Sequence, residues 1–177
     1  MVCSLILPIR LWSDMRMDAP RSSRRSSEGG LRMLIKLADS QWDHEVRELL
    51  EDAFYYEPSE VDKVMDRYRT SGSQELYVFE DQEEFIGIIG FTMDEQNQLV
   101  ITELVIHPQE RLKGYGRGII LETILLKNPR RIITVTDEDG ADFFRNIGFR
   151  ITGLPANEEG MEQFRCTYEV EIDAGEE

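Results

Sequence analysis

The sequence predicts one α/β domain whose central sheet is mixed, mostly antiparallel and flanked by helices. Its 177 residues suit a single hydrophobic core, since domains of this size bury most of their apolar surface without disulfides. Two early segments show helical spacing of apolar residues, and three β-rich segments with short connections then indicate antiparallel hairpins. A β-α-β pass follows in the C-terminal half.

The first part of the domain is expected to hold one strand, at 34–37, and two helices. Asp39 and Ser40 are N-cap candidates for the first helix. The second, at 60–68, is opened by Pro58-Ser59 and ended by Ser71-Gly72. Apolar residues recur at i, i+3, i+4 and i+7 in both helices: Val46, Leu49, Leu50 and Ala53, then Val61, Val64, Met65 and Tyr68. Each helix therefore buries one face.

The remaining elements follow from β-branched and aromatic enrichment and from turn residues. Asn128-Pro129 and Gly148 are the expected helix stops. The predicted order is β-α-α-β-β-β-α-β-α-β-β. The later strands are expected at 75–79, 85–93, 99–106, 131–135, 149–152 and 164–172, and the later helices at 115–126 and 140–147. If exposed, the last strand would offer an edge to a second copy, which leaves a homodimer open.

Residues 1–32 differ in composition from the rest and are expected to form a disordered leader outside the domain, which spans 33–173 before an acidic tail at 174–177. The leader holds six arginines, no lysine and three acidic residues, with many serines and glycines. Three explanations of this segment stay open: a flexible tail, an organelle transit peptide, or upstream sequence that is not translated. The third reading makes Met33 the start, because Glu28-Gly29-Gly30 codons are purine-rich, like a bacterial ribosome-binding site.

The composition argues against several classes of function. A formal charge of −15 argues against nucleic acid as the main partner, because that polyanion requires clustered Lys and Arg. The longest apolar run, at 119–126, is too short for a membrane span. Two distant cysteines, Cys3 and Cys166, form neither a disulfide framework nor a metal cluster, so we expect a reducing, cytoplasmic compartment and no metal.

The most informative segment, at 104–118, runs from an apolar strand through a basic, glycine-rich turn into a helix. A helix N-terminus binds anions through its unpaired N–H groups and its dipole. Gly114 and Gly116 can take positive φ and let a diphosphate approach the main chain. Between 111 and 131 lie six basic residues and one acidic residue, a positive island on an acidic domain. The island suits an anionic cofactor, and the remaining surface would attract cations.

Two common phosphate motifs do not fit this turn. A P-loop requires Lys and a hydroxyl residue after its second glycine, whereas Arg117-Gly118 follow Gly116. A dinucleotide fingerprint requires glycine where Ile119 stands. The pattern that does fit is Arg111-x-x-Gly114-x-Gly116 after a strand that ends in Leu-x-Val/Ile-x-Pro. It resembles the acyl-coenzyme A loop of the GNAT superfamily of N-acetyltransferases, and the resemblance extends in order from about 34 to 172.

The resemblance implies an acyl-CoA N-acyltransferase fold and acetyl-CoA as co-substrate. The main chain of Leu104, Val105 and Ile106 would pair with the pantetheine arm. The diphosphate would meet the loop amides, contributed by Arg111, Leu112, Lys113, Gly114, Tyr115, Gly116 and Arg117. The segment 137–149 resembles the family's second signature, with Asp137 in the usual Asn position and Phe144 in the position of a Tyr that often protonates the departing thiolate. We expect both residues beside the cofactor.

Acetyl transfer to an amine requires that the acceptor lose its ammonium proton, because an amine of pKa ~10 is mostly protonated at neutral pH. Glu103, beside the expected cofactor strand, is the first candidate base, directly or through water. His107 and His44 are expected to be surface residues. A backbone N–H near Val105 or Ile106 is the expected oxyanion donor. For the acid, Tyr168 or Tyr115 would replace the missing tyrosine, or solvent would protonate the thiolate.

The leading hypothesis is an acetyl-CoA-dependent N-acetyltransferase. Its acceptor would be an amine of a small cationic molecule or a protein lysine or N-terminus, attacking directly in a ternary complex. The alternative is a non-catalytic acyl-CoA sensor on the same fold, which Phe144 in the tyrosine position would allow. Transfer to a hydroxyl, or of a longer acyl group, also stays open. By the resemblance, the two early helices cover the acceptor cleft, and their aromatic residues are expected mainly in its core or at its rim: Phe54, Tyr55, Tyr56 and Tyr68.

Overall fold

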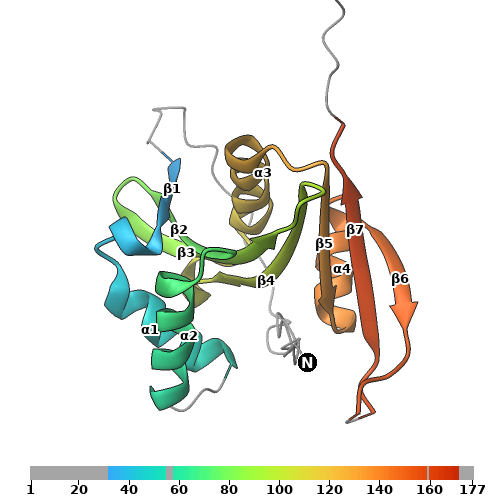
Figure 1. Cartoon of the computed structure of the whole chain (residues 1–177), viewed down its shortest axis with the longest axis horizontal. Helices are drawn as coiled ribbons and strands as arrows, with labels where there is room; N and C mark the ends of the chain where they lie inside the picture. Colours follow the sequence, from blue (N-terminus) through green and yellow to red (C-terminus); the bar gives the residue numbers. More distant parts are fainter. Residues whose placement is uncertain (1–31, 55–57, 159, 172–177) are drawn as a thin grey trace, which may run out of the picture.

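A computed structural model describes residues 32–54, 58–158 and 160–171, and shows a seven-stranded sheet with helices on both faces (Figure 1). The expectations about the leader and the acidic tail, and Tyr55 and Tyr56, lie outside these residues. The chain order is β1 (Arg32–Lys36), α1 (Asp43–Phe54), α2 (Pro58–Thr70), β2 (Gln74–Asp81), β3 (Glu84–Met93), β4 (Gln98–Ile106), α3 (Tyr115–Lys127), β5 (Arg131–Thr136), α4 (Glu138–Asn146), β6 (Arg150–Leu154) and β7 (Gln163–Glu169). Short 3₁₀ helices follow β1 (Leu37–Asp39) and β4 (Pro108–Glu110).

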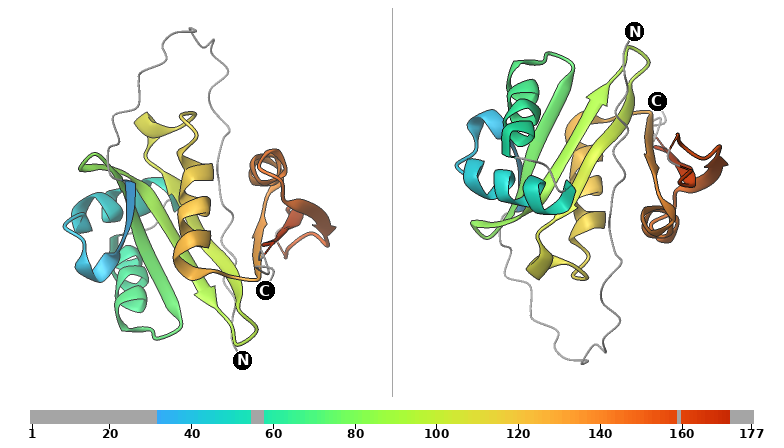
Figure 2. Two further views of the ribbon diagram at one scale, coloured as in Figure 1. Left: turned by 90° about the horizontal axis from the view of Figure 1, so that it is seen from above. Right: turned by 90° about the horizontal axis from the view of Figure 1, so that it is seen from below.

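The sheet is mixed, as predicted, with strand order β1-β2-β3-β4-β5-β7-β6. β4 and β5 are parallel and the other neighbours are antiparallel. Figure 2 shows β1 to β4 as one group of strands, with β5, β7, β6 and α4 standing apart from it. The two groups join through β4 and β5.

Two apolar clusters cover the two faces of the sheet. α1 and α2 pack on one face around Leu50, Met65, Val78 and Val105. On the other face, a larger cluster includes Phe79, Phe91, Ile119, Phe144 and Phe149, from the sheet, α3 and α4. Successive residues of β4, such as Leu104 and Val105, therefore enter different clusters, as the period of a strand requires.

Three details differ from the sequence-based expectations. β1 begins at Arg32, inside the segment assigned to the leader, because Arg32 pairs with Asp81 in the ladder and bonds its carboxylate at 3.2 Å. β7 is not an edge strand: it lies between β5 and β6, so the proposed pairing of this strand with a second copy is wrong. α4 begins at Glu138, before the expected Gly140, because Asp137 is its N-cap.

Candidate active site

The site is built where β4 separates from β5. The parallel ladder between them covers only Gln98 to Val100, which face Arg131 to Ile133. One more bond joins the two strands beyond this ladder, from the hydroxyl of Thr134 to the carbonyl of Ile101, at 3.3 Å. From Thr102 onward β4 has no ladder partner on this side among the described residues, so part of its main chain faces the splay between the strands (Figure 1).

Alternation along the ladder decides which main-chain groups face the splay. The N–H of His107 donates to Ile86 on β3, at 2.9 Å. In an antiparallel pair, alternate residues bond to the same partner, so Val105 also turns its N–H toward β3. Leu104 and Ile106 turn theirs toward the splay. Of the three residues expected to pair with a pantetheine arm, Leu104 and Ile106 have the required orientation, and Val105 does not.

The loop after β4 leads its main chain into the first turn of α3. Leu112 and Gly114 both have positive φ, of 64° and 85°. The first helical bond runs from the N–H of Gly118 to the carbonyl of Gly114, so the N–H groups of Tyr115, Gly116 and Arg117 have no acceptor within the helix. A Cβ built on Gly114 would meet nothing within 4 Å, which leaves room for a ligand above this turn. These features fit an anionic diphosphate.

Two of the basic side chains of this loop hold it in shape. The Nε of Arg111 donates to the carbonyl of Ile106 at 3.1 Å, which ties the loop to the end of β4. Lys113 forms an ion pair with Glu110 at 2.9 Å. Arg117 is exposed in the first turn of α3, where its charge adds to that of the helix N-terminus.

Gly116 is required for packing and not for its backbone angle. It lies inside α3 and is absent from the positive-φ residues of the described chain, so the expectation of a positive φ is wrong for this glycine. A Cβ at Gly116 would lie 2.9 Å from the Cζ of Phe143. Phe143 of α4 therefore packs against the start of α3.

The second signature segment supplies structure around the loop. Phe144 is fully buried and stacks edge-on with Phe149, at a centroid distance of 4.9 Å, so it presents no exposed surface to a cofactor. The carboxylate of Asp137 accepts from the N–H of Gly140 at 3.0 Å and caps α4. In this structure both residues have core or capping contacts, and Phe143 is the one that reaches the loop.

Tyr115 anchors the start of α3 to β2, which lies on the other side of β4 from the splay. Its hydroxyl donates to the carboxylate of Asp81 on β2 at 3.0 Å, and its ring meets Phe79 edge-on. Burial, followed by the bond to Asp81, raises the pKa of Tyr115. The hydroxyl is therefore engaged away from the splay, which makes it a poor proton donor to a leaving thiolate.

Glu103 lies at a bulge in β4 and is almost completely buried, with 5% of its surface exposed. Gly90 pairs with Glu103 and Phe91 with Ile101, so Thr102 is the extra residue of the bulge. The hydroxyl of Tyr68, from α2, donates to the Glu103 carboxylate. Burial raises the pKa of Glu103 from 4.5 to about 7, against a smaller lowering by the charge of Arg67. A carboxyl that titrates near neutral pH suits a general base.

Gly90 makes room for this carboxyl. A Cβ at Gly90 would lie 2.4 Å from Oε2 of Glu103 and 2.6 Å from the hydroxyl oxygen of Tyr68. No sequence pattern indicates that Gly90, Tyr68 and Glu103 meet, because they come from three separate elements. A glycine inside a predicted strand was the one available signal, since such a residue often marks a bulge or a close approach.

The other candidate groups lie away from Glu103. Tyr168 on β7 pairs with Ile132 and packs on Phe149 at 5.3 Å, on the face covered by α4, so the structure does not bring it to Glu103. Cys166 is fully buried, and burial raises the pKa of its thiol to about 12, which makes it an inert apolar residue. His44 is exposed and pairs with Glu48.

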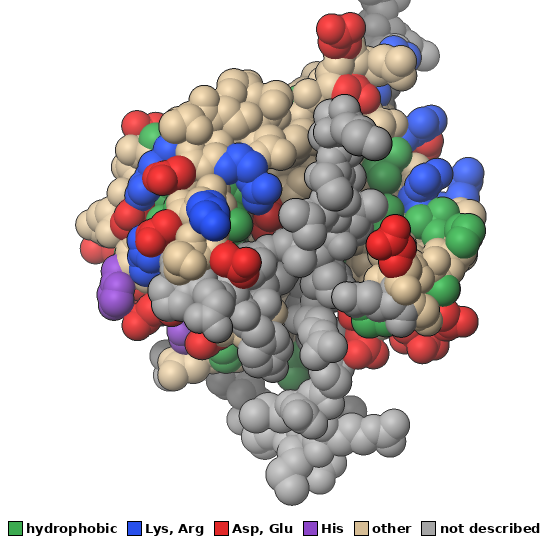
Figure 3. Space-filling view, turned by 60° about the horizontal axis from the view of Figure 1, so that its bottom comes forward, with side chains coloured by type: hydrophobic (Ala, Val, Ile, Leu, Met, Phe, Trp, Pro, Cys, Tyr) green, Lys and Arg blue, Asp and Glu red, His purple; other side chains and the backbone are tan. Residues whose placement is uncertain are grey.

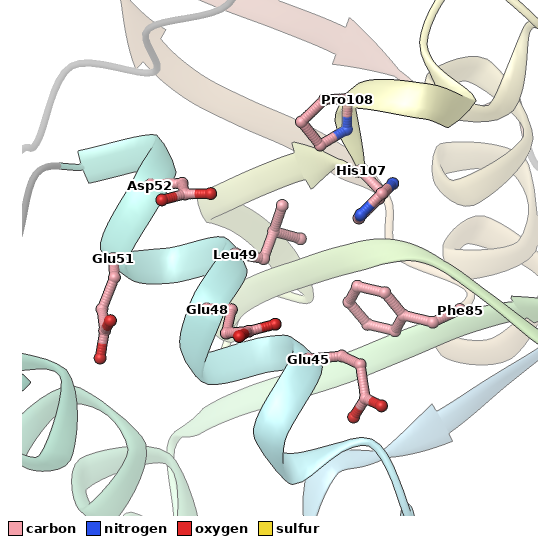
Figure 4. Close-up of a pocket in the computed structure, with 8 residues that line it drawn as sticks. All are labelled: Glu45, Glu48, Leu49, Glu51, Asp52, Phe85, His107 and Pro108. Atoms are coloured by element: carbon pink, nitrogen blue, oxygen red, sulfur yellow. The ribbon is translucent and has the colours of Figure 1, made fainter.

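An acidic groove lies between α1 and the end of β4 (Figure 4). Its volume is about 420 Å³. Four carboxylates of α1 line it: Glu45, Glu48, Glu51 and Asp52. Leu49, Phe85, His107 and Pro108 complete the wall, so His107 is partly buried and lines a groove, whereas the sequence suggested a plain surface residue. Negative charge beside apolar surface favours a cationic, partly apolar ligand.

The six basic residues of the positive island lie in two groups, one near each end of α3. Arg111, Lys113 and Arg117 lie at the loop. Lys127 ends the 13-residue helix and Arg130 and Arg131 follow it, so these three lie about 20 Å away. Lys127 bonds both carboxylate oxygens of Glu75 at 2.8 Å, and Arg131 bonds Glu169. Only the first group can meet a diphosphate at the loop. Elsewhere acidic side chains are frequent, for instance at the lower right of Figure 3, on the part of the molecule that holds α4, β6 and β7.

Among the described residues, no group of three or more His, Cys, Asp or Glu is placed to hold a metal ion. Nor is any helix in those residues long and apolar enough to cross a membrane.

A parallel strand pair that separates beside a bulge, followed by an anion-binding loop at a helix N-terminus, defines the class of acyl-CoA N-acyltransferase folds. Comparisons with known proteins agree. The family described as "Acetyltransferase (GNAT) domain" matches residues 72–151, which hold β2 to β4, the loop, α3, β5 and α4. Residues 72–151 therefore resemble a GNAT acetyltransferase domain. No curated protein matches the chain by sequence.

Solved structures share this fold at low sequence identity. An aminoglycoside 6'-N-acetyltransferase complexed with coenzyme A has a TM-score of 0.66 at 14% identity, over 78% of this chain and 96% of its own. An acetyltransferase from Thermus thermophilus has a TM-score of 0.63 at 16% identity, over 78% and 97%. Spermidine N-acetyltransferase from Vibrio cholerae, in complex with CoA and spermine, has a TM-score of 0.59 at 15% identity, over 78% and 94%.

Proposed function

We propose that this protein transfers an acetyl group from acetyl-CoA to an amine of a cationic acceptor, by direct attack in a ternary complex. The observation that carries the proposal is one continuous path in the structure: the turn at Gly114, the free edge of β4 at Ile106 and Leu104, and then the buried carboxyl of Glu103. A diphosphate at the turn would extend its thioester arm along this edge toward Glu103.

Each part of this path has a defined task. The N–H groups of the first turn of α3 bind the diphosphate, and Arg117 adds charge. The main chain of Leu104 and Ile106 pairs with the pantetheine arm and supplies an N–H for the carbonyl oxygen on which negative charge develops. Holding the two substrates in line supplies on the order of 7 to 11 kcal/mol of the barrier reduction.

Glu103 accepts the proton that the acceptor's ammonium group must lose. Its pKa of about 7 leaves it half ionised at neutral pH while it still binds a proton well. A general base of this kind typically contributes about 10² to 10⁴ in rate. Tyr68 fixes the carboxylate from α2. Because Tyr168 of β7 packs on Phe149 instead, solvent is the proposed proton source for the thiolate, assisted by the acceptor's own second proton.

The acidic groove favours a cationic acceptor. Four carboxylates of α1 line this groove, and Pro108 and His107 line it at the end of β4, where an acceptor would approach. A polyamine, an aminoglycoside-like amine, or a lysine or N-terminus within a basic peptide has the required charge. Two of the structural neighbours are named for acceptors of this chemical class, spermidine and an aminoglycoside.

The test is release of free thiol from acetyl-CoA in the presence of an amine panel, compared with binding of CoA by calorimetry. We expect CoA binding at micromolar concentrations and amine-dependent thiol release, fastest with amines that carry two or more positive charges. CoA binding without amine-dependent release would instead favour the sensor. Equal rates with neutral and polycationic amines would refute the role given to the groove.

A further inference from the structure

The hydroxyl of Tyr68 makes two contacts, and together they fix the direction of its proton. It donates to Oε2 of Glu103, and it lies 2.8 Å from Oγ1 of Thr102. A tyrosine hydroxyl has one proton, and an ionised carboxylate can only accept. With its proton directed to Glu103, Tyr68 is the acceptor in the second contact, and Thr102 is the donor. The lone pairs of Thr102 are then free to accept a proton from elsewhere.

The three side chains differ in their exposure to solvent. Thr102 is the extra residue of the bulge, lies just past the last bond between β4 and β5, and is partly exposed. Tyr68 and Glu103 are each only 5% exposed. A substrate amine can therefore reach the hydroxyl of Thr102 more easily than the carboxylate that must finally hold its proton.

We propose that Thr102 and Tyr68 form a hydroxyl relay that carries the acceptor's proton to Glu103. The inference rests on the function proposed above and assigns to it one catalytic residue, Thr102, and one relay residue, Tyr68. The bulge is what makes the relay: without the extra residue, consecutive side chains of β4 would point to opposite faces, and Thr102 could not share a partner with Glu103.

The transfer balances in protons and electrons. The ammonium group gives a proton to Thr102 Oγ1, whose own proton moves to the Tyr68 oxygen, and the Tyr68 proton moves to the Glu103 carboxylate. The neutral amine then forms its bond to the thioester carbonyl carbon, and the carbon–sulfur bond breaks with its electron pair going to sulfur. The nitrogen releases its second proton to solvent as the amide forms, solvent protonates the thiolate, and Glu103 returns its own proton to solvent.

The charged surroundings support proton uptake near neutral pH. Arg67, next to Tyr68 on α2, favours the ionised carboxylate, and burial opposes it. On the β3 side the facing residue is Gly90, which has no side chain. The ionisation of Glu103 therefore depends on the hydroxyl of Tyr68, on Thr102 through that hydroxyl, and on the charge of Arg67.

The test compares variants in the full-length protein. Thr102→Val keeps the shape and removes the hydroxyl, whereas Thr102→Ser keeps the hydroxyl. We expect kcat to fall by about 10- to 100-fold in Thr102→Val and to stay within about threefold of wild type in Thr102→Ser, with the Kd for CoA unchanged in both. Tyr68→Phe should lower kcat similarly and move the acidic limb of its pH profile upward, since the ionised carboxylate loses a donor.

Tyr77→Phe is the matched control, because Tyr77 also donates to a glutamate, Glu75, at 3.0 Å but on a different part of the sheet. It should leave kcat unchanged. Retained kcat in Thr102→Val, beside a loss in Glu103→Gln, would overturn the relay and leave the base in place. A wild-type protein that binds CoA but releases no thiol with any amine would overturn the proposed function itself.

Discussion

Glu103→Gln tests the base and its environment in one variant. Burial raises the pKa of Glu103 from 4.5 to about 7, so the folded protein holds this proton more tightly than the unfolded chain. The carboxyl's contribution to stability is fully present below pH 4.5 and is lost as pH rises through 7. At about 1.4 kcal/mol per pKa unit, the wild type should lose about 3 kcal/mol of unfolding free energy between about pH 4 and 8 relative to the glutamine variant.

The assay is urea unfolding of both proteins at several pH values, followed by tryptophan fluorescence, together with thiol-release kinetics. The difference in unfolding free energy between variant and wild type should grow with pH through the window from 4.5 to about 7 and then level off. Turnover should fall by about 10² to 10⁴ while CoA affinity is kept. If the unfolding free energies of wild type and variant changed in parallel with pH, burial would not raise the pKa of Glu103. Unchanged turnover in the variant would show that Glu103 is not the base.

Three further predictions concern the surroundings of this carboxyl. Arg117→Glu should weaken CoA binding at least tenfold by calorimetry, whereas Arg130→Glu, at the other end of α3, should not change it; equal effects would point to general electrostatics. Gly90→Ala should lower kcat at least tenfold because its Cβ would displace the Glu103 carboxyl, whereas Gly72→Ala, which meets nothing within 4 Å, should keep kcat. Neutralising the groove with Glu48→Gln and Asp52→Asn should raise KM several-fold for a polycationic amine and leave the Kd for CoA unchanged; an unchanged KM would exclude the groove as the acceptor's approach.

The cofactor loop could be predicted from the sequence because its signals are local. Glycines, basic residues and the preceding apolar strand lie within one segment, and the chemistry of a helix N-terminus does not depend on distant contacts. The helical faces of α1 and α2 and the three hairpin strands follow from local periodicity in the same way.

Contacts between distant segments could not be predicted. Tyr68 meets Glu103 across 35 positions of sequence, through the packing of α2 on the sheet, and no local pattern encodes that distance. The position of β7 between β5 and β6 is a matter of strand order, which alternation within a strand does not specify. In α4 the error was one of helical phase: neighbours on a helix point about 100° apart, so Phe143 reaches the loop while Phe144 enters the core.

The central claim is that the free edge of β4 and the first turn of α3 together hold the CoA moiety. Residue-resolved amide hydrogen exchange, measured with and without CoA, tests it directly. The account predicts that CoA slows exchange at Leu104, Ile106 and Gly116, while Val105, already bonded to β3, stays protected in both states. Unchanged exchange at Leu104 and Ile106 with saturating CoA would contradict it.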